Sequence, residues 1–125
     1  MKFSYIEKYK TLTDILADHK LAALGDSFVN FTYSLALSEM KGEPFGIKVK
    51  GQVLANALKK AGLREYLPSR MSRHTLADAA EALIVYAWLA DLVSLDETVL
   101  VLRKAENSVD AFTRLLLLIR RRVRF

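Results

Sequence analysis

The chain has 125 residues, of which 52% are hydrophobic, which is enough for one compact domain with its own core. It contains no cysteine, which excludes disulfides and thiolate metal sites, so any bound metal would take oxygen or imidazole ligands. The strongly apolar run 115–119 is far shorter than the ~20 residues that span a bilayer, and the N-terminus has no apolar secretion signal. We therefore expect a cytoplasmic protein with no membrane association.

The hydrophobic period is helical along nearly the whole chain, which predicts a single all-α domain over residues 1–125. Thr11 and Asp14 have the spacing of a capping box and predict a helix that runs through Leu24. Gly25 then indicates either a bend or a close approach between backbones, and a second helix is expected from about 26 to 40.

Glycine and proline make 42–47 the clearest loop, with Lys48 and Lys50 at its far edge. A helix is expected from about 52 to 61, and Gly62 ends it. Thr75 with Asp78 predicts a helix that runs to about 92. The pair Ser94 and Glu97 repeats the capping signal, and Ser108 begins the last helix.

Three acids lie in Ala- and Leu-rich sequence: Asp26, Asp78 and Glu81. Burying an ionised carboxylate is costly, so acids in such segments usually meet a cation, a donor set or a metal. Asp78 and Glu81 are three apart on one predicted helix and can serve the same ion. Asp26 and Asp78 also suit helix starts, so each acid alone is compatible with a structural role.

The formal net charge of +5 is unevenly distributed. Basic clusters occur at Lys48 with Lys50 and at Arg70 with Arg73, and both patches suit a polyanion such as nucleic acid. Charge alone leaves a solvated surface equally open. The same alternative applies to the C-terminal arginines, which are Arg114, Arg120, Arg121, Arg122 and Arg124.

Taken together, these motifs resemble the ribonuclease III endonuclease domain. The family's signature, Leu-Gly-Asp followed by an apolar helix, is matched by Leu24-Gly25-Asp26-Ser27-Phe28-Val29. Its second motif is matched by Ala77-Asp78-Ala79-Ala80-Glu81-Ala82-Leu83-Ile84. Between them, Gln52-Val53-Leu54-Ala55 and Ala61-Gly62-Leu63-Arg64-Glu65-Tyr66-Leu67 are similar to the family's middle helix and the segment after it. The resemblance is strongest over 20–92, with the motifs in the family's order.

The resemblance implies an endoribonuclease that uses Mg²⁺ or Mn²⁺ to hydrolyse phosphodiester bonds in double-stranded RNA, leaving 5′-phosphate and 3′-hydroxyl ends. Asp26, Asp78 and Glu81 would be the catalytic and metal-binding residues. The RNA would be held by the dimer surface, through Lys48, Lys50, Arg70 and Arg73 and through the arginine tail as a second patch. The family's homodimer would place Phe28, Phe31 and Leu35 in the apolar seam, although the same spacing also suits intramolecular core. A chain without room for a double-stranded RNA-binding domain resembles the stand-alone Mini-ribonuclease III.

One departure from the family pattern leaves two further hypotheses open. The family's metal-ligating Glu, four residues before the signature Asp, is replaced by Ala22, and its accessory acid falls on His19. Asp18 is a candidate substitute, one helical turn before Ala22. The loss favours a non-catalytic family member that binds RNA or assists assembly, which the three retained acids oppose. An unrelated helical interaction module is the other alternative, and the ordered motifs argue against it.

Overall fold

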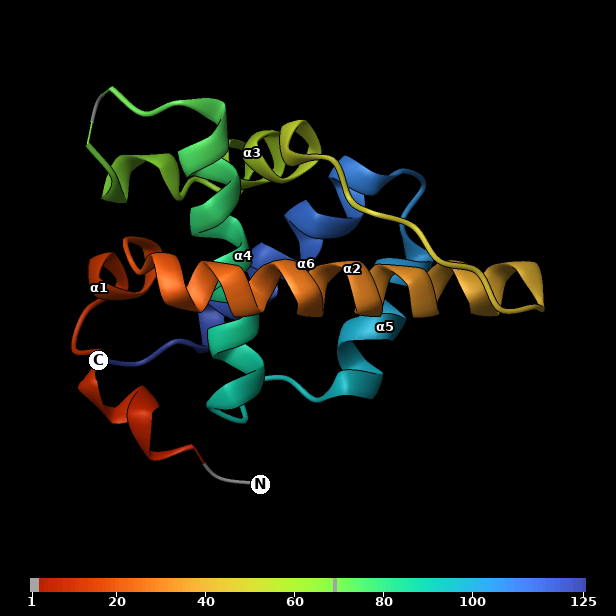
Figure 1. Cartoon of the computed structure of the whole chain (residues 1–125), viewed down its shortest axis with the longest axis horizontal. Helices are drawn as coiled ribbons and strands as arrows, with labels where there is room; N and C mark the ends of the chain where they lie inside the picture. The colour runs from red at the N-terminus through yellow and green to blue at the C-terminus, as the bar shows by residue number, and fades with distance from the viewer. Residues whose placement is uncertain (1–2, 69) are drawn as a thin grey trace.

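The computed structural model describes residues 3–68 and 70–125 of the chain. The described residues contain helices and connecting segments and no β-strand, which confirms the all-α prediction (Figure 1). None of these helices has the length and apolarity needed to cross a membrane. The helical elements in chain order are η1 (Ser4–Lys8), α1 (Leu12–Leu16), α2 (His19–Lys41), α3 (Gly51–Lys60), η2 (Arg64–Tyr66), α4 (Arg73–Leu89), α5 (Leu95–Lys104) and α6 (Ser108–Arg122).

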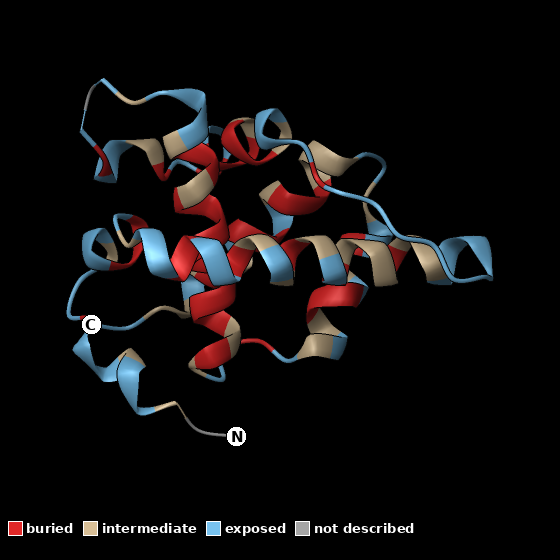
Figure 2. Cartoon of the chain, in the orientation of Figure 1, coloured by how far each residue is buried: buried red, intermediate tan, exposed pale blue. Residues whose placement is uncertain are grey.

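Helix α4 is the centre of the core. From Leu76 to Leu89 every residue except Asp78 and Trp88 is buried, and Figure 2 shows this helix mostly in the buried class beyond its exposed first turn. A helix that is apolar on all sides is stable only when other helices surround it. Helix α2 crosses it (Figure 1), and α3 and α6 pack around it.

The crossing of α2 over α4 depends on Gly25. A Cβ atom at this position would overlap the backbone carbonyl of Glu81 on α4, so only glycine allows the two helices to approach this closely. The predicted close approach is therefore confirmed. The predicted bend is wrong, because Gly25 lies within the uninterrupted helix α2.

The N-terminal helix boundaries differ from the prediction. The capping box between Thr11 and Asp14 is present, but α1 ends at Leu16. The chain then starts a new helix because the Asp18 side chain accepts hydrogen bonds from the backbone N–H groups of Lys20 (2.9 Å) and Leu21 (3.0 Å). The prediction of one helix through Leu24 was wrong for this reason, and the signature Asp26 is the eighth residue of α2.

A second boundary differs at α4. Ser72 caps this helix by accepting from the N–H of Thr75 at 3.2 Å, so α4 begins at Arg73 and the predicted capping box of Thr75 with Asp78 does not form. Asp78 is consequently inside the helix, where its carboxylate does not cap the backbone. The predicted start at Ser94 is confirmed, since its side chain caps α5, and α6 begins at Ser108 as expected.

After α2 the chain turns at Gly42 (φ 74°) and runs back beside the same helix (Figure 1). This returning segment, residues 43–50, has no regular secondary structure. Two serines of α2 hold its backbone: Ser38 Oγ accepts from the N–H of Phe45 at 2.8 Å, and Ser34 Oγ accepts from the N–H of Ile47 at 3.0 Å. The predicted loop is thus fixed to α2 by hydrogen bonds.

Candidate functional site

The three acids singled out by the sequence lie around one pocket of about 390 Å³. Asp26 comes from α2, and Asp78 and Glu81 come from α4, one helical turn apart. The α2–α4 crossing at Gly25 brings the two helices together at this point. The pocket is completed by His19, Ala22, Ala23, Lys48, Val49, Gly51, Leu54, His74 and Ala77.

Glu81 is the most deeply placed of the three carboxyl groups, with a relative exposure of 7%. Burial raises its pKa to about 8, and a hydrogen bond with Asp26 and the negative charges of Asp26 and Asp78 act in the same direction, against the ammonium of Lys48. Two carboxyl groups in contact cannot both ionise at low cost unless a cation lies near them. The pocket is therefore a place where positive charge is favoured.

The other two acids have basic neighbours. Lys48 Nζ lies 3.6 Å from Asp26 Oδ2. Asp78 Oδ2 lies 3.8 Å from His19 Nδ1 on α2 and 3.6 Å from His74 Nε2 on α4. These contacts are longer than good hydrogen bonds and involve exposed basic groups, so their contribution to stability is small.

The donor chemistry of the pocket suits a hard divalent cation. Carboxylate oxygens are the ligands that Mg²⁺ and Mn²⁺ prefer, and Asp26 and Glu81 already converge. Within residues 3–68 and 70–125, no three His, Asp or Glu side chains are preassembled as a group that would hold one metal ion. The residues thus have the right chemistry for a metal, and Asp26, Asp78 and Glu81 would be its ligands after side-chain adjustment.

The position of the missing family carboxylate also lines the pocket. Ala22 is buried against it with 4% exposure. Asp18, considered as a substitute, is committed to another role: besides capping α2 it accepts a hydrogen bond from the hydroxyl of Tyr9 at 2.6 Å. It is not among the residues that line the pocket.

Basic side chains continue from the pocket into an adjoining hollow of about 800 Å³. Three of the predicted RNA-binding residues, Lys48, Lys50 and Arg73, line this hollow, and Lys48 and His74 belong to both hollows. Arg70 is exposed in the segment before α4 and lines neither of them. The structure therefore groups three of the four predicted residues beside the carboxylates.

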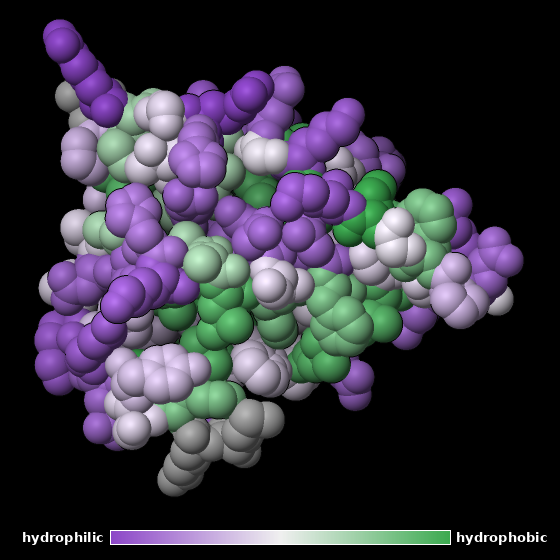
Figure 3. Space-filling model, viewed as in Figure 1, coloured by the Kyte–Doolittle hydropathy of each residue, from purple (hydrophilic) through white to green (hydrophobic). Residues whose placement is uncertain are grey.

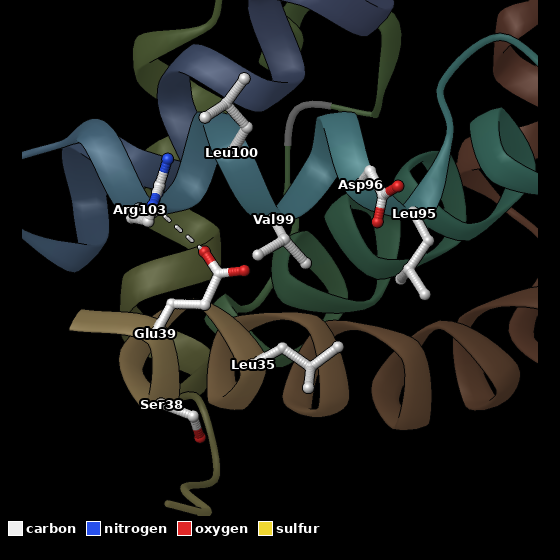
Figure 4. A pocket seen from close by; sticks show the side chains of 8 residues that line it. All are labelled: Leu35, Ser38, Glu39, Leu95, Asp96, Val99, Leu100 and Arg103. Carbon is white, nitrogen blue, oxygen red and sulfur yellow. Dashed lines mark ion pairs between the residues drawn. The ribbon is translucent and has the colours of Figure 1, made fainter. Parts of the chain in front are cut away.

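The three residues predicted for a dimer seam have different surroundings. Phe28 is half-buried and packs on the ring of Trp88, with 5.3 Å between centroids. Phe31 is 55% exposed. Leu35 lines a groove of about 540 Å³ between α2 and α5, where it faces Leu95 and Val99 (Figure 4). Hydrophobic side chains gather over α2 and α5 on this face (Figure 3).

Several C-terminal arginines connect helices. Arg122 donates to both carboxylate oxygens of Glu97, at 2.6 and 2.8 Å, which ties α6 to α5. Arg120 donates to the carbonyl oxygen of Ala61 at 2.9 Å, at the end of α3. Arg114 pairs with Asp110 on its own helix at 3.1 Å. Arg120 and Arg122 thus connect α6 to other helices, whereas Arg114, Arg121 and Arg124 are exposed.

Sequence reasoning missed one residue of the site and left two without a role. Asn30 donates from Nδ2 to Asp26 Oδ1 at 3.3 Å and accepts from the N–H of Val49 at 2.7 Å. The signal for Asn30 was its position four residues after Asp26, on the same face of a helix. His19 and His74 come from different helices, and only the tertiary structure brings both to Asp78.

Comparison with known proteins bears on the identity of the chain. A search of curated proteins found no match. A family model described as ribonuclease III matches residues 19–122. This match covers both acid-bearing helices and most of the chain. The chain therefore belongs to the ribonuclease III family.

Proposed function

We propose that this protein is a metal-dependent endoribonuclease that hydrolyses phosphodiester bonds in double-stranded RNA during RNA processing. The observation that carries the proposal is the convergence of Asp26, Asp78 and Glu81 around one pocket with Lys48, Lys50 and Arg73 beside it. Carboxylates that hold a cation next to side chains that hold phosphate are what phosphodiester hydrolysis requires.

The role proposed for each side chain follows from its position. Asp26, Asp78 and Glu81 would hold Mg²⁺ or Mn²⁺, which when bound supplies a Lewis acid and lowers the pKa of a water molecule. The lysines and Arg73 hold the duplex through its phosphates, because double-stranded RNA is recognised mainly by shape, phosphates and 2′-hydroxyls. Arg70, exposed three residues before Arg73, would add to the same basic surface.

A homodimer completes the proposal, because one pocket can cut only one strand of a duplex. The exposed Phe31 and the apolar groove at Leu35 support an interface on the face of α2 that carries them. Phe28 would contribute from beneath, through its packing on Trp88. We propose that this activity takes place in the cytoplasm.

The test is cleavage of a long labelled RNA duplex with Mg²⁺, with Mn²⁺ and with EDTA. We expect cleavage that requires the metal and yields 5′-phosphate ends, and Glu81→Gln should abolish it while leaving duplex binding intact. Lys104→Met, which removes an exposed charge at the end of α5, is the matched control and should cut like the native protein. Retained cleavage in Glu81→Gln would contradict the proposed site.

A non-catalytic family member that binds RNA is the second candidate. Two observations favour it: Ala22 stands in the pocket where the family has a ligand, and the described residues have no preassembled metal group. It predicts tight duplex binding with no cleavage in either metal. The same experiment distinguishes the two functions.

A further inference from the structure

The residue that joins the carboxylate pocket to the returning segment is Asn30. Its amide group makes two hydrogen bonds in opposite directions, from Nδ2 to Asp26 Oδ1 (3.3 Å) and at Oδ1 from the N–H of Val49 (2.7 Å). One rigid side chain thus fixes both a pocket acid and the backbone next to Lys48. A side chain whose donor and acceptor are both used is held in one orientation.

Asn30 is part of a row of polar residues spaced four apart on α2, namely Asp26, Asn30, Ser34 and Ser38. This spacing places them on one face of the helix. The last three accept hydrogen bonds from alternate backbone N–H groups of the returning segment, at Val49, Ile47 and Phe45. The segment therefore lies along α2 in a single register (Figure 1).

The register determines where Lys48 goes. Its ammonium lies 3.6 Å from Asp26 Oδ2, although the side chain is 77% exposed. The backbone of Lys48 is held on both sides, by Ser34 at Ile47 and by Asn30 at Val49. Because the backbone of Lys48 is held and its ammonium group is exposed, the ammonium can contact a phosphate from solvent and still remain beside the acids.

The charges around the pocket explain why the position of Lys48 matters. Once a metal has displaced the proton of Glu81, three ionised carboxylates and one ammonium would sum to −2, which a single divalent cation balances. A phosphodiester brings a further negative charge to the same place, and Lys48 is the side chain that faces both Asp26 and the adjoining basic hollow. The lysine repels a cation in the pocket and attracts the phosphate, so its two effects have opposite signs.

We propose that Lys48 is a catalytic residue that contacts the RNA phosphate at the Asp26 side of the pocket, and that Asn30 is the positioning residue that holds it there. The proposal rests on the proposed function, which it deepens by naming the side chain that contacts the phosphate, Lys48, and the residue that positions it, Asn30.

The first experiment measures two affinities that need no turnover. Calorimetric titration of the RNA-free protein with Mn²⁺ should show about tenfold tighter binding in Lys48→Met, as expected for removal of a unit positive charge next to the carboxylates that would hold a divalent ion. Duplex RNA binding, measured in EDTA at several salt concentrations, should weaken, and the slope of log affinity against log salt should fall by about one.

Controls separate the charge of Lys48 from its side-chain volume and from general electrostatics. Lys48→Arg keeps the charge and should restore the native salt slope. Lys104→Met removes a distant charge and should change neither affinity. A merely structural role for Lys48 would not tighten Mn²⁺ binding, so an unchanged or weaker Mn²⁺ affinity in a folded Lys48→Met protein would overturn the proposal.

Asn30 is tested by a double-mutant cycle with Lys48. Asn30→Ala alone should weaken duplex binding and slow cleavage. In the Lys48→Met background the same change should have a much smaller effect, because there is no ammonium left to misplace. Additive effects would contradict the positioning role. Thermal melting checks folding, and Asn30→Ser is the second variant in case Asn30→Ala fails to fold.

The outcomes also separate this proposal from the proposed function. If the native protein cuts no duplex but Lys48→Met lowers the salt slope, the hydrolase fails and Lys48 remains a phosphate contact. If the native protein cuts duplex and Lys48→Met cuts faster, Lys48 blocks the pocket and the present proposal is wrong. If Lys48→Met cuts at least tenfold more slowly and binds Mn²⁺ more tightly, both stand.

Discussion

The backbone of Gly25 on α2 lies against the carbonyl oxygen of Glu81 on α4, so closely that any Cβ at position 25 would overlap it. Gly25 directly precedes Asp26, the pocket acid of α2. It contacts Glu81, the most deeply buried acid of the pocket, on α4. The separation of the two helices and the geometry of the pocket are determined by the same contact.

Replacement of Gly25 should therefore disturb both stability and the pocket. Alanine normally stabilises a helix relative to glycine by up to about 1 kcal/mol, but here overpacking should cost about 1–3 kcal/mol. We expect Gly25→Ala to lower the thermal unfolding midpoint and to weaken metal binding. Gly46→Ala is the control, since a Cβ there meets nothing within 4 Å, and it should melt like the native protein. If Gly25→Ala melts like the native protein, α2 and α4 can move apart at this contact without loss of stability.

Glu81 should make the metal-free protein less stable as pH rises. Because its folded-state pKa is raised to about 8 from the ordinary 4.5, the stability it confers is complete below about pH 4.5 and is lost as pH rises toward 8. Glu81→Gln has no ionisable group at this position, so its stability does not fall with rising pH in this way. Its free energy of unfolding at pH 8 should exceed that of the native protein by at least about 1.4 kcal/mol, the equivalent of one pKa unit.

The measurement for Glu81 is thermal or urea unfolding in EDTA at several values between pH 5 and 8. Addition of Mg²⁺ at pH 8 should raise the stability of the native protein and leave Glu81→Gln unchanged, because a ligand stabilises only the state that binds it. Parallel pH profiles for the two proteins would contradict the burial-driven shift.

Ala22 offers a gain-of-function test. Ala22→Glu adds a fourth carboxylate to the pocket wall and should tighten Mn²⁺ binding and raise the cleavage rate if a weakened second metal site limits the native protein. Without metal the same variant should be less stable than native, since it adds a negative charge to a site that already has three acids. Ala22→Gln has the same size without the charge and should show neither gain. If a folded Ala22→Glu protein shows no increase in cleavage rate, a second metal site does not limit the native protein.

The proposed dimer is tested at Phe31. Sedimentation of the native protein should give a dimer, and Phe31→Asp should shift it to monomer, because a charge on an apolar interface must be desolvated on association. Leu117→Asp changes a comparably exposed apolar residue on α6 and should remain dimeric. A native protein that is monomeric at all concentrations would rule the dimer out.

The arginine tail can be divided into structural and exposed members by comparing Arg122→Met with Arg121→Met. Arg122 holds the pKa of Glu97 below its usual range through two hydrogen bonds. The stabilisation is therefore present above about pH 4.5 and is lost as pH falls through the folded-state pKa. We expect Arg122→Met to melt a few degrees lower than native at pH 7 and this difference to shrink as pH falls below 4.5, leaving the part due to the hydrogen bond from Arg122 to the carbonyl oxygen of Leu92. Arg121→Met should melt like native throughout this pH range.

Much of the protein was determined by the sequence alone. The helical period predicted the all-α fold, and the spacing of Gly25, Asp26, Asp78 and Glu81 identified both site helices, because local patterns and backbone-limited residues leave their mark on a single segment. The helix start after Thr11 was predicted, but the end of α1 at Leu16 and the new start at His19 were missed. Thr11 and Asp18 are both good caps, and spacing does not say that the chain uses both.

What only the tertiary structure decided is how groups distant in sequence combine. Asn30 meets Val49, and both His19 and His74 meet Asp78, because helix crossings and a returning segment bring them together. The burial of Glu81 and the commitment of Asp18 to Tyr9 also depend on packing between elements. Periodicity reports which face of a helix is buried, whereas the electrostatics of a site depend on which faces meet.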